Sequence, residues 1–269
     1  MVLKSTRFSP EQMLEQLETI RDLSPACAPL HQNGPLLEQL VCRDIELEGL
    51  MPWSSNYTFL ARLTAKDDEP LLAIYKPGDG ERPLWDFPDG TLSQREFASY
   101  LVSQLLGWPK IPPTVLRSGP HGLGSVQLFI EAEYEAHYFN MRDVPTFTGD
   151  FRDMALFDFI VNNADRKGGH CLKGRDGQIW AIDHGLTFHP APKLRTVIWE
   201  FTDSPIPESR LADLSRLVNL LDDSRLRGVL LNLITERELD AFQQRTAALA
   251  ERRQFPPLRS GRNMPYPPI

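Results

Sequence analysis

Two aspartates, Asp165 and Asp183, each end an apolar segment and each open a polar turn that contains glycine. A single aspartate at a turn is usually only a solvated turn residue. Two such residues, flanking a short predicted hairpin, favour a functional site instead. Their arrangement suits phosphoryl transfer, in which one carboxylate orients the attacking hydroxyl and another holds magnesium on the nucleotide phosphates.

A lysine and a glutamate could complete such a site. Lys76 ends the apolar run 71–75, and Glu96 lies in the first turn of a predicted helix. A lysine that projects from a strand can bind nucleotide phosphates, and a glutamate on the following helix can hold it there. Each residue also has a simpler interpretation, Lys76 as a solvated strand-end lysine and Glu96 as the partner of Ser93 in a capping box. Glu131, after another predicted strand, is a less favoured partner for the lysine.

Small polar residues precede one of the predicted strands. Ser54, Ser55 and Asn56 could donate hydrogen bonds to phosphate, although an ordinary β-turn would also explain them. No GxGxxG or Walker A motif is present to strengthen the case for a phosphate-binding loop. We therefore treat these three residues as cofactor-binding candidates that depend on the rest of the site.

The residues around Asp165 supply the remaining candidates. We expect Asp165 to act as a general base and group Arg166, which follows it directly, with it as catalytic. His170 is a candidate metal ligand together with Asp183, although magnesium prefers oxygen ligands. The histidines here also leave open a zinc or iron hydrolase, but the sequence has no HExxH motif and no HD pair.

Hydrophobic periodicity predicts both helices and strands around these residues. The first half should contain a helix from Ser9 to Leu23, a proline-rich connector over 24–36, strands at 45–50, 56–63, 71–75 and 126–131, and a helix with one apolar face from Ser93 to Gly107. The second half should contain a helix over 151–161, a hairpin formed by 171–173 and 179–182, and helices from Glu208 with breaks near 222–224 and Thr235.

This order of elements predicts an α+β protein with two lobes. Residues 1–36 should form an N-terminal helix and connector, 37–133 a strand-rich N-lobe with the nucleotide-binding lysine, and 134–251 a mainly helical C-lobe with the catalytic and metal loops. Residues 252–269 should form a loose tail.

Composition narrows the choice of compartment and partner. The net charge of −7 argues against nonspecific binding to nucleic acid. The three cysteines have no CxxC spacing, which fits a reducing compartment. No apolar run approaches the ~20 residues of a membrane-spanning helix, and the first 20 residues lack the apolar core of a signal peptide. We expect a cytoplasmic protein without integral membrane association, and the oligomeric state stays open.

The residues from 163 to 188 resemble a known superfamily. The run Asn163 to Arg166, a polar residue five positions after Asp165, and the run 182–188 look like the catalytic and metal-binding loops of the phosphatidylinositol 3-/4-kinase-like superfamily. More closely, residues from about 50 to 201 resemble a bacterial family that is common in actinobacteria and related to these lipid kinases. The stretches that carry this closer resemblance are 73–77, 80–88, 162–172 and 193–197.

The resemblance implies a two-lobed protein-kinase-like fold with an ATP site between the lobes. Lys76 would then hold the phosphates, Glu96 would orient the lysine, Asp165 would be the catalytic aspartate and Asp183 the magnesium ligand. Two positions depart from the pattern of the relatives: His170 stands where they have asparagine or glutamate, and His184 follows the metal-binding aspartate.

We therefore expect an ATP- and magnesium-dependent phosphotransferase that acts on a hydroxyl of an unknown protein or small molecule. Three alternatives stay open: a pseudokinase that serves as a binding module, a phosphoinositide kinase and an AMP transferase. Only a thin cluster of basic residues (Lys167, Lys193 and Arg195) is available for a phosphoinositide headgroup, and the acidic chain has no general attraction to anionic membranes.

Overall fold

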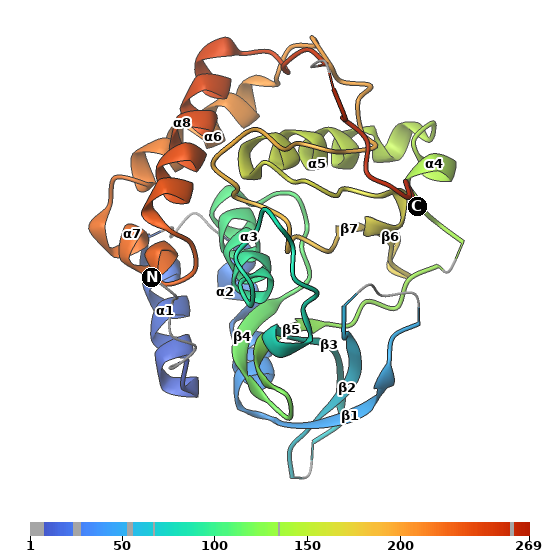
Figure 1. The fold of residues 1–269 in the computed structure, drawn as a ribbon, viewed down its shortest axis with the longest axis vertical. Coiled ribbons are helices and arrows are strands. Elements are labelled where there is room, and N and C mark those ends of the chain that lie inside the picture. Colours follow the sequence, from blue (N-terminus) through green and yellow to red (C-terminus); the bar gives the residue numbers. More distant parts are fainter. Residues whose placement is uncertain (1–7, 24–27, 53–55, 67, 134, 259–260) are drawn as a thin grey trace.

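A five-stranded antiparallel sheet forms one half of the molecule in the computed structural model, which describes residues 8–23, 28–52, 56–66, 68–133, 135–258 and 261–269 (Figure 1). The strands, in the spatial order β1-β2-β3-β5-β4, are β1 (Asp44–Leu50), β2 (Phe59–Thr64), β3 (Leu71–Pro77), β4 (Thr114–Gly119) and β5 (Gly122–Leu128). The expected strands at 45–50, 56–63 and 71–75 are confirmed with small shifts of their ends. The fourth expected strand ends earlier than predicted, and its hairpin partner β4 was not predicted from the sequence.

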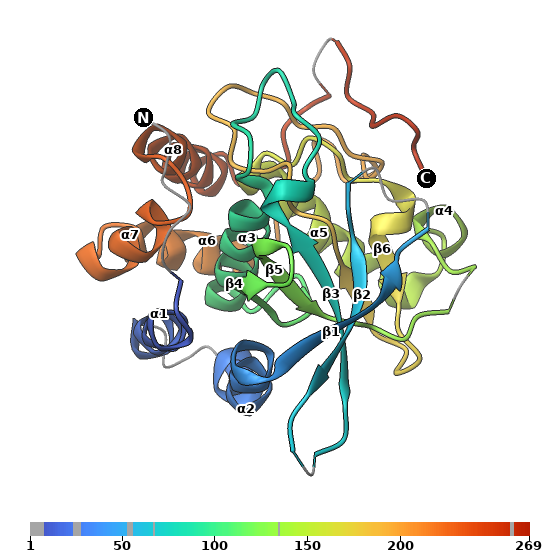
Figure 2. The ribbon, with the colours of Figure 1, turned by 60° about the horizontal axis from the view of Figure 1, so that its bottom comes forward.

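Helix α3 (Leu92–Leu106) packs between the sheet and the helical half (Figures 1 and 2). It ends as expected at Gly107, whose φ of 83° is accessible to glycine at little cost. Two expectations about this helix are wrong. All its residues are buried rather than one face, because it has neighbours on every side. Its N-cap is Thr91 and not Ser93. The Ser93 N–H donates to the Glu81 carboxylate instead of to Glu96, so the expected capping box does not form.

Two helices precede the sheet. α1 (Pro10–Leu23) is confirmed, and its start is fixed by reciprocal hydrogen bonds between Ser9 and Gln12. The expected connector over 24–36 is wrong from Ala28 onward, because α2 (Ala28–Cys42) begins there. Pro29 falls in its first turn, where a missing N–H leaves no helical hydrogen bond unmade, so a proline-rich sequence does not exclude a helix. α2 and α1 both contact β4 (Figure 2).

Helices dominate the second half. They are α4 (Tyr138–Met141), α5 (Thr148–Val161), α6 (Glu208–Leu220), α7 (Ser224–Leu231) and α8 (Glu236–Arg252). The predicted hairpin is confirmed as β6 (Cys171–Lys173) paired with β7 (Ile179–Ala181). The expected breaks between the last three helices are also confirmed, and Thr235 closes a capping box with Glu238 at the start of α8. The molecule is thus an α+β protein with a sheet-rich half and a helical half.

The last segment of the chain differs from the expected loose tail. After α8, the residues 253–258 and 261–269 form no helix or strand, but Phe255 is fully buried, and the Asn263 carbonyl accepts a hydrogen bond from Thr196 N–H (3.0 Å). The Pro268 carbonyl accepts another from Gly168 N–H (2.8 Å), in the loop that follows Asp165. The segment therefore runs back along the helical half towards β6 (Figure 1). Proline removes N–H donors but leaves carbonyl acceptors, which explains how such a segment is held.

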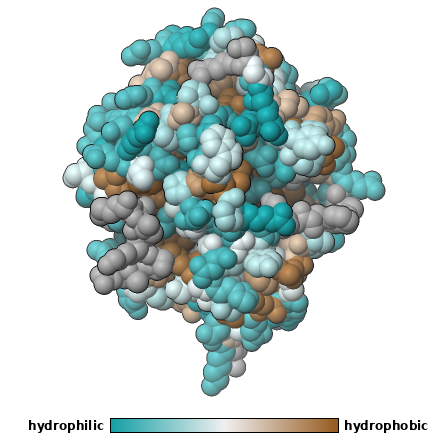
Figure 3. Space-filling view, viewed as in Figure 1, coloured by the Kyte–Doolittle hydropathy of each residue, from teal (hydrophilic) through white to brown (hydrophobic). Residues whose placement is uncertain are grey.

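The surface offers no sign of a membrane span. Among the described residues, no helix is long and apolar enough to cross a bilayer. The face seen in Figure 3 carries hydrophobic side chains in separate spots among hydrophilic ones.

Candidate active site

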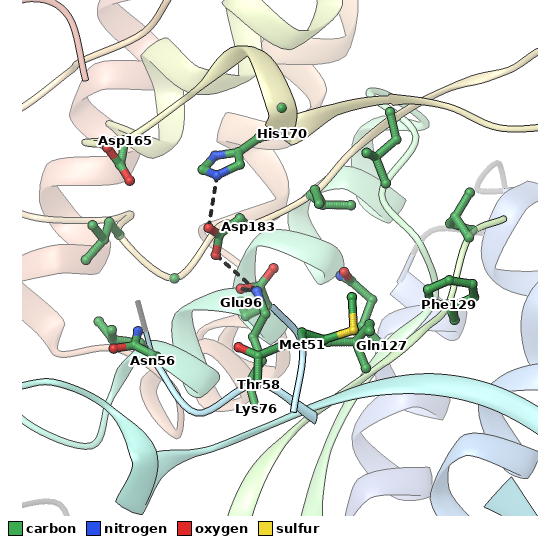
Figure 4. Close-up of a pocket in the computed structure, with 18 of the residues that line it drawn as sticks. Met51, Asn56, Thr58, Lys76, Glu96, Gln127, Phe129, Asp165, His170 and Asp183 are labelled. Carbon is green, nitrogen blue, oxygen red and sulfur yellow. Dashed lines mark hydrogen bonds and ion pairs between the residues drawn. The ribbon is translucent and has the colours of Figure 1, made fainter. Parts of the chain in front are cut away.

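A cleft of about 690 Å³ lies between the sheet-rich and the helical half. Lys76 of β3 and Glu96 of α3 line one side, and Asp165, His170 and Asp183 line the other (Figure 4). The structure therefore brings together five residues that are far apart in the sequence. Both polar and apolar side chains line the rest of the cleft, the apolar ones including Met51, Ile74, Phe129, Leu172 and Ile182.

Lys76 lies between two carboxylates at the centre of the cleft. Its Nζ is 3.1 Å from Glu96 Oε2 and 3.0 Å from Asp183 Oδ1. Glu96 is almost fully buried, and its other oxygen accepts a hydrogen bond from His184 N–H (3.0 Å). Burial alone would lower the pKa of Lys76, but Asp183 and Glu96 outweigh it and raise that pKa, so the amine stays charged. The capping-box explanation of Glu96 is wrong, because its carboxylate is used by the lysine and by the 183–185 turn.

Asp183 follows strand β7 by two residues and adopts a left-handed backbone conformation, with a φ of 61°. Its Oδ1 faces Lys76, and its Oδ2 lies 3.2 Å from His170 Nε2. Burial favours the protonated form of this carboxylate, but the charge of Lys76, together with the contact with His170, holds its pKa far below its usual range. The side chain is 47% exposed and opens onto the cleft, so Asp183 is a permanent anion that a ligand can reach.

Asp165 lies in a different electrostatic environment. Its backbone N–H bonds to Asn163 Oδ1 (3.0 Å), and its carboxylate is 3.4 Å from Lys167 Nζ. Burial raises the pKa of Asp165 to about 6, because the attraction of Lys167 only partly offsets desolvation and the repulsion of Asp183 adds to it. A carboxylate with such a pKa can take up a proton near neutral pH.

Arg166 does not reach the cleft, which corrects its assignment as a catalytic residue. Its guanidinium is fully buried and forms a forked ion pair with Asp158 of α5 (Nε–Oδ2 2.9 Å). The same group donates to the carbonyls of Ile182 (2.8 Å) and His170 (3.3 Å). Arg166 therefore joins the loop of Asp165 to the turn of Asp183, and it positions both aspartates without touching a ligand.

The remaining predicted cofactor-binding residues have varied placements. Ser54 and Ser55 lie outside the described residues. Asn56 lines the cleft, and its Oδ1 accepts a hydrogen bond from Arg82 N–H (2.9 Å). Glu131 is not among the residues that line the cleft, because its side chain is 66% exposed and faces Arg175. The assignment of Glu131 to the cofactor site is therefore not supported by the geometry.

Sequence reasoning missed the residues that hold the two loops in place. His184 is buried, and its Nε2 lies 2.6 Å from Arg166 Nη2. Burial and the neighbouring Arg166 lower the pKa of His184 well below its usual value, so it is neutral and accepts from the arginine. Asn163 Nδ2 donates to the same Asp158 carboxylate (2.9 Å). Asp158, the one charged residue in the otherwise apolar stretch 154–161 of α5, was the available signal of this network.

A second missed feature links the two halves at the mouth of the site. Asp86, in the loop between β3 and α3, forms an ion pair with Lys193 (2.7 Å), and both side chains are nearly buried. Lys193 also lies over the ring of Trp85 (4.8 Å), which is 90% exposed. Phe87 is buried against His189 and Arg95. The stretches 80–88 and 193–197 therefore meet in space, although more than 100 residues separate them.

The donor set is suited to a cation that also binds phosphate. Among the described residues, no group of three or more His, Cys, Asp or Glu side chains is arranged to enclose a metal ion. Magnesium in nucleotide sites is often held by only one or two carboxylates together with substrate phosphates and water. The accessible Asp183 carboxylate fits that mode of binding.

A relative of known sequence covers nearly the whole chain. The protein Rv2133c of Mycobacterium tuberculosis is 37% identical over an alignment of 265 residues, and the match covers 86% of this chain and 95% of that protein. The chain belongs to the Rv2133c family. The expected bacterial relationship is thus confirmed, and no described protein-family profile matches the chain.

The chain also has a more distant similarity to a plant phosphatidylinositol kinase. Phosphatidylinositol 4-kinase gamma 4 of rice (Oryza sativa subsp. japonica) is 27% identical over an alignment of 158 residues, and the match covers 49% of this chain. The matched region spans only 27% of the rice protein.

Two solved structures are similar in outline. The proinflammatory kinase CtkA of Helicobacter pylori matches with a TM-score of 0.49 and 12% identity over 79% of this chain and 93% of its own. Hydra Fam20, solved with sugar, matches with a TM-score of 0.48 and 15% identity over 80% of this chain and 86% of its own. Because both TM-scores lie below 0.5, neither likeness establishes the fold.

Proposed function

We propose that this Rv2133c family member is an ATP-dependent phosphotransferase with a two-lobed, kinase-like architecture. One observation carries the proposal: the ion pair between Lys76 of β3 and Glu96 of α3 lies inside a cleft whose far wall presents Asp165 and Asp183. Protein kinases place a strand lysine, a helix glutamate, a catalytic aspartate and a metal-binding aspartate in the same relation. Similarity to the rice phosphatidylinositol 4-kinase supports this proposal independently of the geometry.

The cleft has separate surfaces for the two ends of a nucleotide. Ile74, Phe129 and Leu172 would cover the adenine ring, because flat apolar walls are typical of such pockets. Lys76 would bond the phosphates while Glu96 keeps its amine in place. A protein that uses ATP and has free cysteines at Cys42 and Cys171 fits the cytoplasm, which we propose as its compartment.

ATP with its divalent cation, Mg²⁺ in this proposal, supplies an electrophilic γ-phosphoryl group and the charge that neutralises the departing ADP. Asp183 would offer the protein's ligand to that cation, because it is the accessible permanent anion of the cleft. Asp165 would accept the proton of the acceptor hydroxyl as the new oxygen–phosphorus bond forms and the bond to the bridging β–γ oxygen breaks. Lys167, 3.4 Å from Asp165, would keep a cation beside the group being transferred.

A hydroxyl on a protein or a small molecule fits the acceptor side better than a phosphoinositide. Of the three basic residues there, Lys193 is already paired with Asp86, and Lys167 is paired with Asp165. Only Arg195 is left without an ion-pair partner among the described residues, so an inositol headgroup with several phosphates would find one uncommitted cation.

The proposal is tested by the products that the protein forms from ATP. We expect the wild type to convert ATP into ADP when water, sugars, cyclitols and hydroxyl-bearing peptides are offered as acceptors. Asp165→Asn should lower that rate about 10²–10⁴-fold, as expected for loss of a general base, and should still bind ATP. Asp143→Asn, which changes a 90% exposed aspartate, is the matched control and should keep the wild-type rate.

The other outcomes separate the alternatives. Formation of AMP would identify a nucleotidyl transferase and contradict the proposal. ATP binding without any conversion, unchanged by Asp165→Asn, would indicate a binding module. Phosphate transfer to phosphatidylinositol vesicles but to none of the soluble acceptors would indicate a lipid kinase.

A further inference from the structure

His170 is held between two fixed partners, one at each ring nitrogen. Its Nδ1 lies 3.3 Å from the backbone N–H of Lys167, within the short helical turn Gly168–His170 and its cap. Its Nε2 lies 3.2 Å from Asp183 Oδ2, and Figure 4 shows the imidazole pointing down at that carboxylate. The ring is only 14% exposed, so water has little access to either nitrogen.

These two contacts determine which nitrogen carries the proton. A backbone N–H can only donate, so Nδ1 must present its lone pair to Lys167. Because Nδ1 accepts the Lys167 N–H, it carries no proton, and the ring in this geometry is the neutral imidazole. A neutral imidazole has one N–H, and with Nδ1 accepting, that proton is on Nε2 and points at Asp183.

We propose that His170 is a positioning residue that donates a hydrogen bond to Asp183, and that it does not ligate the cation that accompanies the nucleotide. The inference rests on the proposed function, because it concerns the cation of a nucleotide. A metal ligand must offer a lone pair, but Nε2 offers a proton in the direction of Asp183, and the lone pair of Nδ1 is covered by Lys167 N–H.

The arrangement gives Asp183 a defined orientation before any ligand arrives. Lys76 donates to Oδ1, and His170 Nε2 lies 3.2 Å from Oδ2, so each carboxylate oxygen has one partner. An ionised carboxylate has about four lone-pair positions, and the two bonds leave positions free for a cation. Asp183 then supplies a ligand, and because no group of three or more His, Cys, Asp or Glu side chains encloses a cation in the described part of the chain, phosphate oxygens and water would supply most of the others.

Nitrogen NMR tests the hydrogen bond in the free protein. In protein labelled with ¹⁵N-histidine, the His170 signals should show a protonated Nε2 and an unprotonated Nδ1, assigned by their loss in His170→Gln. A proton on Nδ1 would overturn the inference without any bearing on whether the protein binds ATP.

Electron spin echo spectroscopy tests the metal ligation. Mn²⁺ is the probe, added with a non-hydrolysable ATP analogue to wild-type protein that carries either ¹⁴N- or ¹⁵N-histidine. We expect identical nitrogen modulation from the two samples, because no histidine nitrogen is bound to the metal, and we expect Asp183→Asn to release the Mn²⁺. A modulation that changes with the histidine label would overturn the inference. If no Mn²⁺–nucleotide complex forms in the wild type, the proposed function fails, and the NMR result still decides the hydrogen bond.

Two variants distinguish the effect of the His170 N–H donor from the effect of its side-chain volume. His170→Gln keeps an N–H donor of similar reach, whereas His170→Leu keeps the volume and loses the donor. We expect the leucine variant to weaken binding of the Mn²⁺–nucleotide complex about tenfold, as for other residues that orient a metal ligand, and the glutamine variant to restore most of it. His121→Leu, at an exposed histidine of the β4–β5 turn, is the matched control and should not change binding. Equal weakening in the leucine and glutamine variants would contradict a donor role.

Discussion

The turn of Asp183 and the loop of Asp165 face the same cleft, but they shift the pKa of their aspartates in opposite directions. Asp183 is paired with Lys76 and His170, and its pKa lies far below its usual range. Asp165 forms one ion pair, with Lys167, and burial outweighs it and raises the pKa of Asp165 to about 6. Charge partners dominate in the first region and desolvation dominates in the second.

This difference assigns different chemistry to the two carboxylates. A group that never accepts a proton suits a cation, and a group that accepts one near neutral pH suits proton transfer. The two regions are nevertheless joined directly, because Arg166, next to Asp165, donates a hydrogen bond to the carbonyl of Ile182, next to Asp183. The contrast is therefore electrostatic and not a consequence of separate scaffolds.

Breaking the shared scaffold should have the largest effect. Arg166→Leu leaves Asp158 buried without its cation, and we expect the free energy of unfolding to fall by about 3–5 kcal/mol in urea titrations. Adding Asp158→Leu should recover part of this loss, because the uncompensated charge is removed. Arg175→Leu, at a 77% exposed arginine, is the control and should change stability by less than about 0.5 kcal/mol. A small loss in Arg166→Leu would mean that the two regions do not share this support.

Removing the lysine should affect the Asp183 region next. Lys76→Met leaves the buried Glu96 without its cation, and we expect the free energy of unfolding at pH 7 to fall by about 2 kcal/mol. Without Lys76 the carboxylates should have raised pKa values in the folded state, so the loss should shrink as the pH falls and they take up protons. Chemical denaturation at pH 7 and pH 4 measures this. Lys66→Met, in the exposed β2–β3 turn, is the matched control. A loss that is the same at pH 7 and pH 4 would contradict this electrostatic explanation.

The Asp165 region should respond with the opposite sign. The pKa of Asp165 is raised from 3.8 to about 6, so the folded state binds this proton more tightly than the unfolded state does. Its contribution to stability therefore decreases as the pH rises through this window. Asp165→Asn should stabilise the protein by about 1–2 kcal/mol at pH 8, and the gain should vanish once the pH falls below the unfolded-state pKa of 3.8, where the wild-type carboxyl becomes protonated in both states. Thermal unfolding of the variant at a series of pH values measures this, and a variant less stable than wild type at pH 8 would contradict the contrast between the regions.

The smallest effect should come from Glu131, which faces solvent outside both regions. Glu131→Gln breaks only its contact with Arg175, and both side chains are largely exposed. We expect a change of less than about 0.5 kcal/mol in the free energy of unfolding and no change in ATP affinity by calorimetry. Weaker ATP binding in this variant would contradict this prediction and indicate that Glu131 belongs to the cofactor site.

The sequence predicted most elements whose periodicity was continuous. The apolar run before Lys76, the helix before Asn162 and the hairpin before Asp183 all carry local signals, so the placement of these residues at the ends of elements could be predicted. α2 could not, because its prolines resemble loop punctuation: Pro29 lies in the first turn, where a proline is harmless, but Pro35 lies inside the helix, where a proline normally disfavours one. The held C-terminal segment could not either, since its hydrogen bonds use carbonyl groups that every residue has.

The chemistry-bearing side chains were easier to predict than those that hold them. Lys76, Glu96, Asp165 and Asp183 stand out as polar residues at the ends of apolar segments. Arg166 was predicted as catalytic because it is adjacent to Asp165 in sequence, but a neighbouring side chain can point the other way, in this case into the core against Asp158. The link between Asp86 and Lys193 spans more than 100 residues, and no local pattern predicts a contact of that kind.

Calorimetric titration with a non-hydrolysable ATP analogue and Mg²⁺ tests the central claim most directly. The account predicts binding to the wild type and to Lys66→Met with equal affinity, and binding at least about tenfold weaker to folded Lys76→Met, because a buried charge-assisted bond to phosphate is lost. Equal affinity in all three proteins, or no binding to the wild type, would contradict a nucleotide site built around Lys76.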